Sequence, residues 1–296
     1  MLALMNHNYD IHFDRLELFR DGGSTAYTLY SGAKKYFLRV LKPAFFDTAI
    51  NAVDIQVFLH EQGLPVPPVI FSKSGLPYVK TSAGLLILYD FIEGAEAVPA
   101  DDAELAGALI GQLHREMQNY PVELFQRDKH FYIGRYIDQL RAKQYKKADA
   151  FAEYGDVLWE KLKDLPHAYC HGDMHPGNMH KTPDGKLYLL DFDTSCCGFP
   201  MYDIALFCNQ THYFKYNKQD YAKSRSMLHR FLPAYETHCS ISTDEINAFY
   251  DLIALSHFAL QATIIELYGI DCVDSRFFDK QLDWLCRWRE QCEQMQ

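Results

Sequence analysis

The chain has 296 residues, enough for one large domain or two modest ones that each bury a core. Its hydrophobic fraction of 48% and aromatic fraction of 15% exclude a disordered chain. The 29 Lys and Arg residues against 39 Asp and Glu give a net charge of −10. This balance argues against a nucleic-acid binder with a broad basic surface and favours a cationic or metal-neutralised partner.

Neither a membrane span nor an export signal is expected. No apolar run reaches the ~20 residues that cross a bilayer, and the richest stretch, 252–267, is interrupted by polar side chains. The first residues lack a basic segment followed by a long apolar core. The eight cysteines are therefore expected to be reduced thiols of a cytoplasmic protein.

Residues 15–90 have the pattern of a small antiparallel sheet with one helix inserted. The helix is predicted over about 46–62, because apolar residues recur there at helical spacing and Gly63 follows. Short apolar or alternating runs between turn residues predict strands at 16–20, 26–31, 35–41, 69–71, 78–80 and 85–89.

The rest of the chain is mostly helical in pattern, starting with an amphipathic helix that Asp101 and Asp102 are expected to cap. The stretch 168–193 is the β-like exception. Further helices are predicted near 129–145, 149–163, 203–210, 217–232, 243–268 and 274–293. The expected fold class is α+β, with a small sheet lobe over 1–89, a hinge at 90–94 and a helical lobe over 95–296.

Two loops joined by a hairpin carry the residues suited to chemistry. The turn at 183–185 folds two short strands back on each other and brings Asn178 beside Asp191. Their amide and carboxylate oxygens are hard ligands suited to Mg²⁺, which takes further ligands from water and substrate phosphates. Asp173 lies five residues before Asn178 in a loop that cannot be helical, where it can accept a proton from a nucleophile near the metal.

The spacing His-x-Asp-x-x-x-x-Asn from His171 to Asn178, followed by the hairpin and Asp-Phe-Asp, resembles the aminoglycoside phosphotransferase, choline kinase and homoserine kinase superfamily. The resemblance extends over roughly residues 15–270 and implies a protein-kinase-like, two-lobed fold. It implies that Asp173 is the catalytic base and that Asn178 and Asp191 bind Mg²⁺. The resemblance also implies that His171 anchors the catalytic loop.

The resemblance also implies a nucleotide site in the small lobe. After the first strand, Gly22, Gly23 and Ser24 would cover phosphates with backbone N–H groups, although an ordinary hairpin turn explains the glycines at least as well. In the third strand, Arg39 stands where these kinases usually have a phosphate-binding Lys. An Arg can hold phosphate through its bidentate fork, and Lys42 is a nearby substitute.

Two further parts of such a site are expected. On the helix over 46–62, Asp54 is the candidate acidic partner of the phosphate-binding residue, and a solvated surface role is the alternative. The stretch 86–94 resembles the strand and linker whose backbone holds adenine, which places Asp90 and Ile92 against the base.

Several residues near these motifs have more than one interpretation. Asp203 is expected to cap the helix after the metal loop, residues 191–193, and to buttress the catalytic loop. Asp193 replaces a glycine of protein kinases and would assist the metal or substrate, or make structural hydrogen bonds. Later aromatic residues would pack helices or line the acceptor site, at Phe207, Tyr213, Phe214 and Tyr216.

Four neighbouring histidines suggest zinc as an alternative metal, at His167, His171, His175 and His180. Pro176 disrupts the helix that would align two of them, and the nearby carboxylate and amide groups suit a harder ion. Mg²⁺ is therefore the expected metal.

The expected function is transfer of the γ-phosphoryl group of ATP to a hydroxyl of a small molecule, with Mg²⁺ as cofactor. Amino alcohols, choline-like amines, aminoglycosides and sugars are acceptors of proteins that resemble this one. The charge of −10 suits a cationic acceptor, and a solubilising acidic surface is the ordinary alternative explanation of it. Two alternatives stay open: a protein Ser/Thr kinase of the bacterial stress-response type, and a nucleotide-binding protein of the same fold without turnover.

Overall fold

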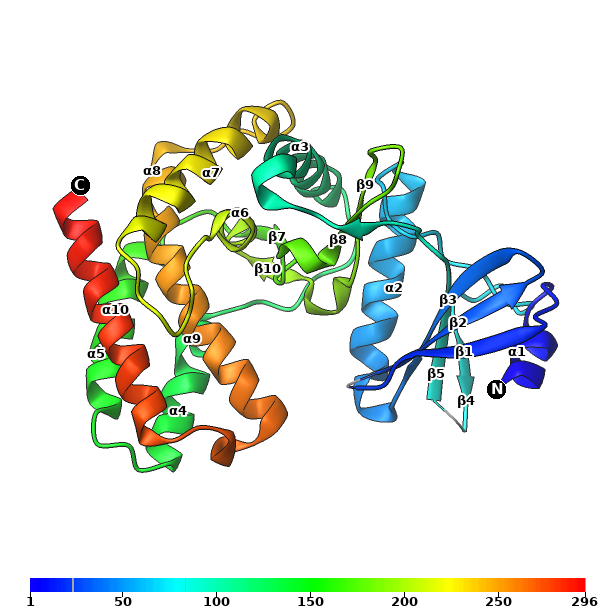
Figure 1. Cartoon of the computed structure of the whole chain (residues 1–296), viewed down its shortest axis with the longest axis horizontal. Coiled ribbons are helices and arrows are strands. Elements are labelled where there is room, and N and C mark those ends of the chain that lie inside the picture. The colour runs from blue at the N-terminus through cyan, green and yellow to red at the C-terminus, as the bar shows by residue number, and fades with distance from the viewer. Residues whose placement is uncertain (23, 83, 296) are drawn as a thin grey trace. The chain divides into compact units, whose positions relative to one another are not determined.

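The computed structural model describes residues 1–22, 24–82 and 84–295, which divide into two compact units (Figure 1). The first unit contains Met1–Ala97, Asn119–Pro121 and Pro176–Ser195, and the second contains Val98–Gln118, Val122–His175 and Cys196–Gln296. The hairpin that follows the catalytic loop therefore groups with the N-terminal residues, although its neighbours in sequence belong to the second unit.

The first unit is built on a five-stranded sheet in which every neighbouring pair is antiparallel. In sheet order the strands are β1 (Arg15–Arg20), β2 (Thr25–Ser31), β3 (Lys34–Leu41), β5 (Gly84–Asp90) and β4 (Val79–Thr81). In the central strand β3, Arg39 is paired with Ile87 of β5. The run predicted as a strand at 69–71 forms an isolated bridge from Val69 to Tyr89 instead.

Helices cover both faces of this sheet (Figure 1). α1 (Leu2–Asn8), which the sequence pattern did not predict, packs on one face through Met5. α2 (Phe46–Glu61) packs on the other face through Val53. Successive residues of β5 alternate between the two hydrophobic clusters. Burial on both faces explains why β5 is one continuous apolar run.

A three-stranded sheet completes the first unit, in the order β6 (Ala95–Glu96), β8 (Met179–Lys181) and β9 (Leu187–Leu189). β8 and β9 form the predicted hairpin, with Met179 opposite Leu189. Its turn contains Gly185 at a φ of +87°, which side chains with a Cβ rarely adopt. At the open end, the backbone N–H of Leu190 donates to the carbonyl of Asn178 at 2.9 Å, so the catalytic and metal loops meet there.

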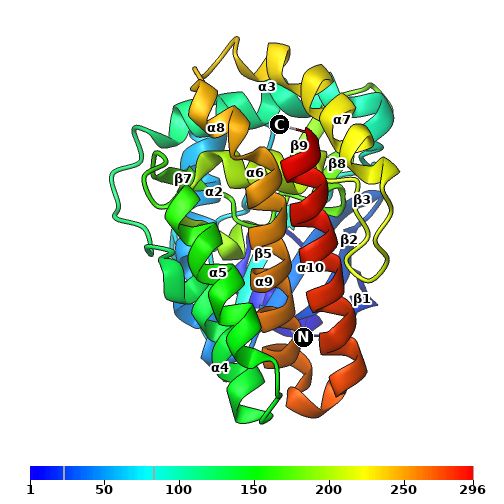
Figure 2. The same ribbon diagram turned by 90° about the vertical axis from the view of Figure 1, so that its left-hand side faces the viewer.

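The second unit is helical around a two-stranded sheet of β7 (Ala168–Cys170) and β10 (Cys196–Gly198). Its helices are α3 (Pro99–Met117), α4 (Arg135–Ala142), α5 (Ala148–Leu162), α6 (Pro200–Cys208), α7 (Gln219–Tyr235), α8 (Thr243–Asn247), α9 (Phe249–Tyr268) and α10 (Ser275–Met295). α9 packs against α4, α5 and α10 (Figure 2). α3 and α7 approach so closely that a Cβ at Gly107 would lie 2.3 Å from the backbone oxygen of Phe231.

Two of the predicted helices are divided. The stretch predicted at 129–145 begins with a π-helical turn, His130–Gly134, before α4. The helix predicted over 243–268 is interrupted at Ala248, between α8 and α9. Within the described ranges, no helix is long and apolar enough to cross a bilayer. The eight cysteines, all of which the structure describes, are free thiols.

Candidate active site

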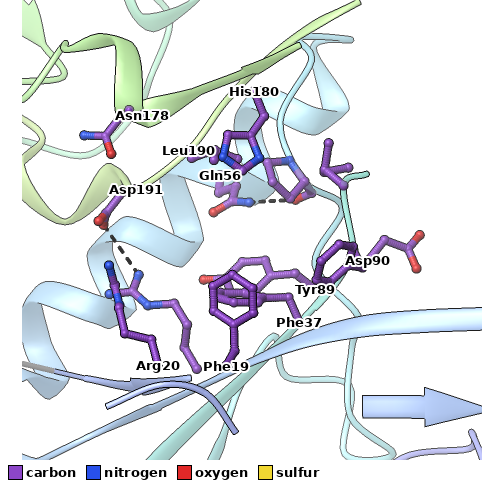
Figure 3. A pocket seen from close by; sticks show the side chains of 15 residues that line it. Phe19, Arg20, Phe37, Gln56, Tyr89, Asp90, Asn178, His180, Leu190 and Asp191 are labelled. Carbon is purple, nitrogen blue, oxygen red and sulfur yellow. Dashed lines mark hydrogen bonds and ion pairs between the residues drawn. The ribbon is translucent and has the colours of Figure 1, made fainter. Parts of the chain in front are cut away.

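A pocket of about 250 Å³ lies in the first unit (Figure 3). The rings of Phe19, Phe37 and Tyr89 lie together in it, and Asn178 and Asp191 lie at the end away from Asp90 (Figure 3). The full lining is Phe19, Arg20, Phe37, Arg39, Gln56, Pro67, Tyr89, Asp90, Phe91, Ile92, Gly177, Asn178, His180, Leu190 and Asp191. The pocket therefore combines an aromatic part with a charged, oxygen-rich part.

The alternation of β3 brings Arg39 into this pocket. Phe37 and Arg39 line it, whereas Tyr36 and Leu38 belong to the hydrophobic cluster on the α1 face. Because alternate residues of a strand share a face, the two sets point to opposite sides of the sheet. Lys42 lies beyond the end of β3 and is exposed. Of these two cations, Arg39 is the one that lines the pocket.

Arg39 forms a bidentate ion pair with Asp193. Its Nη1 lies 3.1 Å from Oδ1 and its Nη2 lies 2.5 Å from Oδ2 of that carboxylate. A second carboxylate, Asp191, has its Oδ1 3.7 Å from Nη1. Burial alone would lower the pKa of the Arg39 guanidinium, but the hydrogen bonds and carboxylate charges raise this pKa above its ordinary value. Arg39 is therefore a permanent cation between two acidic groups.

Asp191 has an uncommon backbone conformation, with φ 58° and ψ 73° in the left-handed region. This region costs a residue with a Cβ roughly 1–2 kcal/mol, although Asp tolerates it better than most. Strain of this kind is concentrated at functional sites. The Asp191 side chain is 43% exposed, so its oxygens are accessible in the pocket.

Asn178 and Asp191 together offer an amide oxygen and a carboxylate to a cation in the pocket. Among the described residues, no group of three or more His, Cys, Asp and Glu could hold a metal ion on its own. Mg²⁺ fits such a donor set, because it keeps several waters and takes phosphate oxygens as further ligands. The residues present are therefore suited to a metal that arrives with a phosphate-containing ligand.

The aromatic part of the pocket adjoins the end of β5. The ring centroids of Phe19 and Phe37 are 5.4 Å apart in an edge-to-face arrangement, and those of Phe37 and Tyr89 are 6.4 Å apart. Asp90 and Ile92, from the predicted hinge, line the same pocket. Flat apolar surfaces with nearby backbone polar groups suit a planar heterocycle.

The glycine turn is not part of this lining. Gly22 and Ser24 lie between β1 and β2, outside the pocket as the described residues define it, and Gly23 lies outside the described residues. Phe19 and Arg20, which end β1 just before the turn, do line the pocket. Sequence reasoning overlooked Arg20, a second cation, although its place directly before a glycine turn was a usable signal.

Asp54 is also not brought to Arg39. Its residue is exposed on α2, where partial burial of the carboxyl raises its pKa. The α2 residue in the pocket is Gln56, whose Nε2 donates to the backbone oxygen of Pro67 at 2.6 Å. The predicted partner on α2 is thus replaced by Asp193, for which the sequence left a structural or metal role open.

The first part of the catalytic-loop motif, residues 171–175, lies in the second unit, where Asp203 fixes it. The fully buried carboxylate of Asp203 accepts hydrogen bonds from the backbone N–H groups of His171 at 2.6 Å and Gly172 at 2.8 Å. Nε2 of His114 lies 3.1 Å from the same carboxylate. Asp203 therefore buttresses the loop as predicted. It does not cap α6, because the N-cap residue is Phe199 and Asp203 lies in the first turn.

Arg127, which sequence reasoning missed, holds the same loop. Its Nη1 donates to the backbone oxygen of Gly172 at 3.1 Å, and its guanidinium lies 4.4 Å from the centroid of the Phe131 ring. Gly172 has a φ of +80°, so glycine is required there. Asp173 follows directly, with its carboxylate 3.5 Å from Nε2 of His175. The backbone before Asp173 is therefore fixed from both its N–H and its C=O sides.

The zinc alternative gains no support from the histidines in the described structure. His171 is buried in the second unit, and the ring of His167 lies 4.4 Å from that of Phe199. His180 belongs to the first unit and lines the pocket, where partial burial lowers its pKa. These side chains occupy different surroundings and form no common ligand set in the described residues.

Comparison with known sequences identifies the family. The model of the phosphotransferase enzyme family matches residues 15–233. The chain belongs to this family. A homoserine kinase of Zymomonas mobilis subsp. mobilis is 22% identical over 250 residues, which cover 77% of this chain and 72% of the relative. The chain is therefore a phosphotransferase of a family of small-molecule kinases.

Solved structures of related kinases have the same fold. A microcompartment-associated aminopropanol kinase matches with a TM-score of 0.72 and 16% identity, covering 98% of this chain and 94% of that chain. An amicoumacin kinase in complex with AMP-PNP, Ca²⁺ and Ami matches with a TM-score of 0.71 and 18% identity, covering 99% and 92%. The phosphotransferase thus has the protein-kinase-like α+β fold that the sequence predicted.

Proposed function

We propose that this phosphotransferase transfers the γ-phosphoryl group of ATP to a hydroxyl of a small molecule, with Mg²⁺ as cofactor. The pocket of the first unit carries the proposal, because an aromatic slot beside Asp90 and Ile92 adjoins Arg39 and the oxygen ligands Asn178 and Asp191. A planar base, a phosphate chain and a hard cation need these three kinds of surroundings. The complex of the amicoumacin kinase with AMP-PNP and Ca²⁺ supports the assignment.

Each residue then has a distinct task. Asn178 and Asp191 would hold Mg²⁺, which when bound neutralises charge on the phosphates. Arg39 would donate charge-assisted hydrogen bonds to phosphate oxygens. Asp173 would orient the acceptor hydroxyl and accept its proton. Backbone N–H groups of Gly22 and Ser24, in the turn that follows the pocket residues Phe19 and Arg20, would cover the phosphates once ATP fills the pocket.

The acceptor class we propose is a small amino alcohol. Two of the similar proteins are named for homoserine and aminopropanol, which both carry an amine and a hydroxyl. The net charge of −10 also favours a cationic acceptor over an anionic one. The acceptor would bind in the helical lobe, residues 95–296, joined by the hinge 90–94 to the nucleotide lobe, residues 1–89.

A panel of acceptors read by ADP release tests the proposal. Homoserine, 1-amino-2-propanol, choline, an aminoglycoside and glucose would each be supplied with ATP and Mg²⁺ at matched concentration. At least one amino alcohol should raise ADP release well above the acceptor-free rate, and Asp173→Asn should remove that increase. If the enzyme phosphorylates lysate proteins and no small molecule raises ADP release, the acceptor is a protein and the proposed acceptor class is wrong. An unchanged rate in Asp173→Asn would contradict the assigned base.

A further inference from the structure

The ion pair between Arg39 and the metal loop points to a positioning residue. We propose that Asp193 positions Arg39 for phosphate binding, so that residues 191–193 supply both a metal ligand and the partner of the phosphate-binding cation. The inference rests on the proposed function, since the phosphate site is part of it.

The donor geometry of Arg39 permits both contacts at once. A guanidinium has five N–H donors in a fixed plane, and the bidentate pair with Asp193 uses one from Nη1 and one from Nη2. The pair leaves three donors unused, and a side-chain hydrogen bond between the guanidinium and Tyr89 takes one of them, so two remain for other acceptors. Arg39 can therefore stay bound to Asp193 and still donate to phosphate oxygens in the pocket. A Lys at this position could not form this bidentate fork.

The carboxylate of Asp193 is itself held in place by its neighbours. Asp193 lies in the 3-10 turn Phe192–Thr194, which packs against α2. Phe192, the residue before it, is 2% exposed and anchors the turn in the core. The Asp193 side chain is 28% exposed, so it is largely shielded while it contacts the guanidinium. Such a partner restricts the rotamers of Arg39 before any ligand binds.

α2 offers no equivalent partner among the residues that the structure describes. Asp54 is exposed, and the ion pairs of Arg39 in the described structure go to Asp191 and Asp193 instead. Gln56 does line the pocket, but its amide nitrogen donates to the backbone of Pro67 and it carries no charge. The metal loop therefore takes the role that the sequence analysis expected of the helix.

Removal of Asp193 has a specific consequence for the metal ligand. Asp191 already lies 3.7 Å from Nη1 of Arg39. Without the bidentate partner, the guanidinium would pair with Asp191 instead, since an opposite charge at this distance attracts it strongly in a shielded site. That pairing would withdraw Arg39 from phosphate and compete with Mg²⁺ for Asp191.

A double-mutant cycle with Mg·ADP affinity as the readout tests the inference. Asp193→Asn should weaken Mg·ADP binding about tenfold when Arg39 is present and less than twofold in the Arg39→Gln background. Asp193→Glu should restore part of the affinity. Asp47→Asn removes an exposed carboxylate at the start of α2 and serves as the matched control. Calorimetric binding and the KM for ATP would both be measured.

The outcomes are separable. Equal losses from Asp193→Asn in both backgrounds would mean that Asp193 acts on the metal directly and would overturn the inference. A loss from Asp54→Asn as large as that from Asp193→Asn would return the role to α2 and would also overturn it. Thermal unfolding of the ligand-free variants forms a second cycle, and additive effects of Arg39→Gln and Asp193→Asn there would disprove the pair itself. Absence of Mg·ADP binding in the unmodified protein would overturn the proposed function together with the phosphate role.

Discussion

Oδ2 of Asp203 lies 2.6 Å from the backbone nitrogen of His171, and the other oxygen of the same carboxylate accepts the N–H of Gly172. An Asn at this position would turn an amide N–H₂ group toward one of those donors. We expect Asp203→Asn to lower kcat about ten- to a hundredfold, because a buried donor left unsatisfied costs ~1–3 kcal/mol and displaces Asp173. Calorimetry should find Mg·ATP affinity within about twofold of normal. Asp220→Asn, at another buried carboxylate, is the control.

The phosphate-binding cation can be identified by substitution. Arg39→Ala should weaken nucleotide binding roughly ten- to a hundredfold, since charge-assisted hydrogen bonds contribute ~1.5–3 kcal/mol each. Arg39→Lys should retain part of the affinity, because it keeps the charge but not the fork. Lys42→Ala should have little effect, since Lys42 is exposed beyond β3. Isothermal titration with Mg·ADP checks all three, and a loss confined to Lys42→Ala would contradict the assignment.

Mg²⁺ and ATP should bind together. Asn178 and Asp191 provide too few hard ligands for a tight site without phosphate oxygens. Titration of Mg²⁺ into nucleotide-free protein should give weak binding, and chelation should lower ATP affinity. Tight Mg²⁺ binding without nucleotide, or ATP affinity that is indifferent to chelation, would be the opposite result.

Neutralising either proposed catalytic carboxylate should abolish turnover for a different reason. Asp173→Asn removes the base but leaves the pocket of the first unit intact, so most Mg·ATP affinity should remain. Asp191→Asn removes metal charge, so the metal-dependent part of the affinity should be lost. Equal losses of nucleotide binding in the two variants would refute this division of roles.

Acid should destabilise the fold through His257 in α9. Burial lowers the pKa of His257 to about 3. Its ring stacks on that of Trp284, with 3.6 Å between the ring centroids. In the unfolded chain this pKa returns to about 6.5, so the stability that the neutral ring provides is present above pH 6.5 and is lost as the pH falls toward 3. The free energy of unfolding should fall by up to ~1.4 kcal/mol per pH unit from this group. Urea unfolding of His257→Phe should show a shallower pH dependence, whereas the exposed His229→Asn should not.

The elements of the fold with strong local patterns were predictable. β5 and α2 follow from a continuous apolar run and from helical spacing ended by Gly63. α1 was missed because a seven-residue helix carries little periodicity and is stabilised by Met5 packing under the sheet. The strand predicted at 69–71 forms only a bridge among the described residues, since apolar runs alone do not fix pairing.

Sequence placed several pocket residues but not their partners. Arg39 was singled out from the resemblance to the kinase family, and Asn178 and Asp191 from the hairpin; the structure gathers the three in one pocket. The partner of Arg39 depends on how the metal loop packs against α2, which no spacing along the chain encodes. The contact between Arg127 and Gly172 could not be predicted either, because the two residues are distant in sequence and meet only in the folded structure.

At Asp191, the left-handed backbone favours glycine for the stability of the fold, whereas the proposed chemistry needs a carboxylate. Glycine would adopt the same conformation without steric penalty, so drift under selection for a stable fold alone would replace the aspartate at that position. An aspartate on such a backbone points to a task that needs its charge, because strain of this kind is concentrated at functional sites. By this reasoning the backbone of the metal loop fits an active enzyme better than a nucleotide-binding protein of the same fold without turnover.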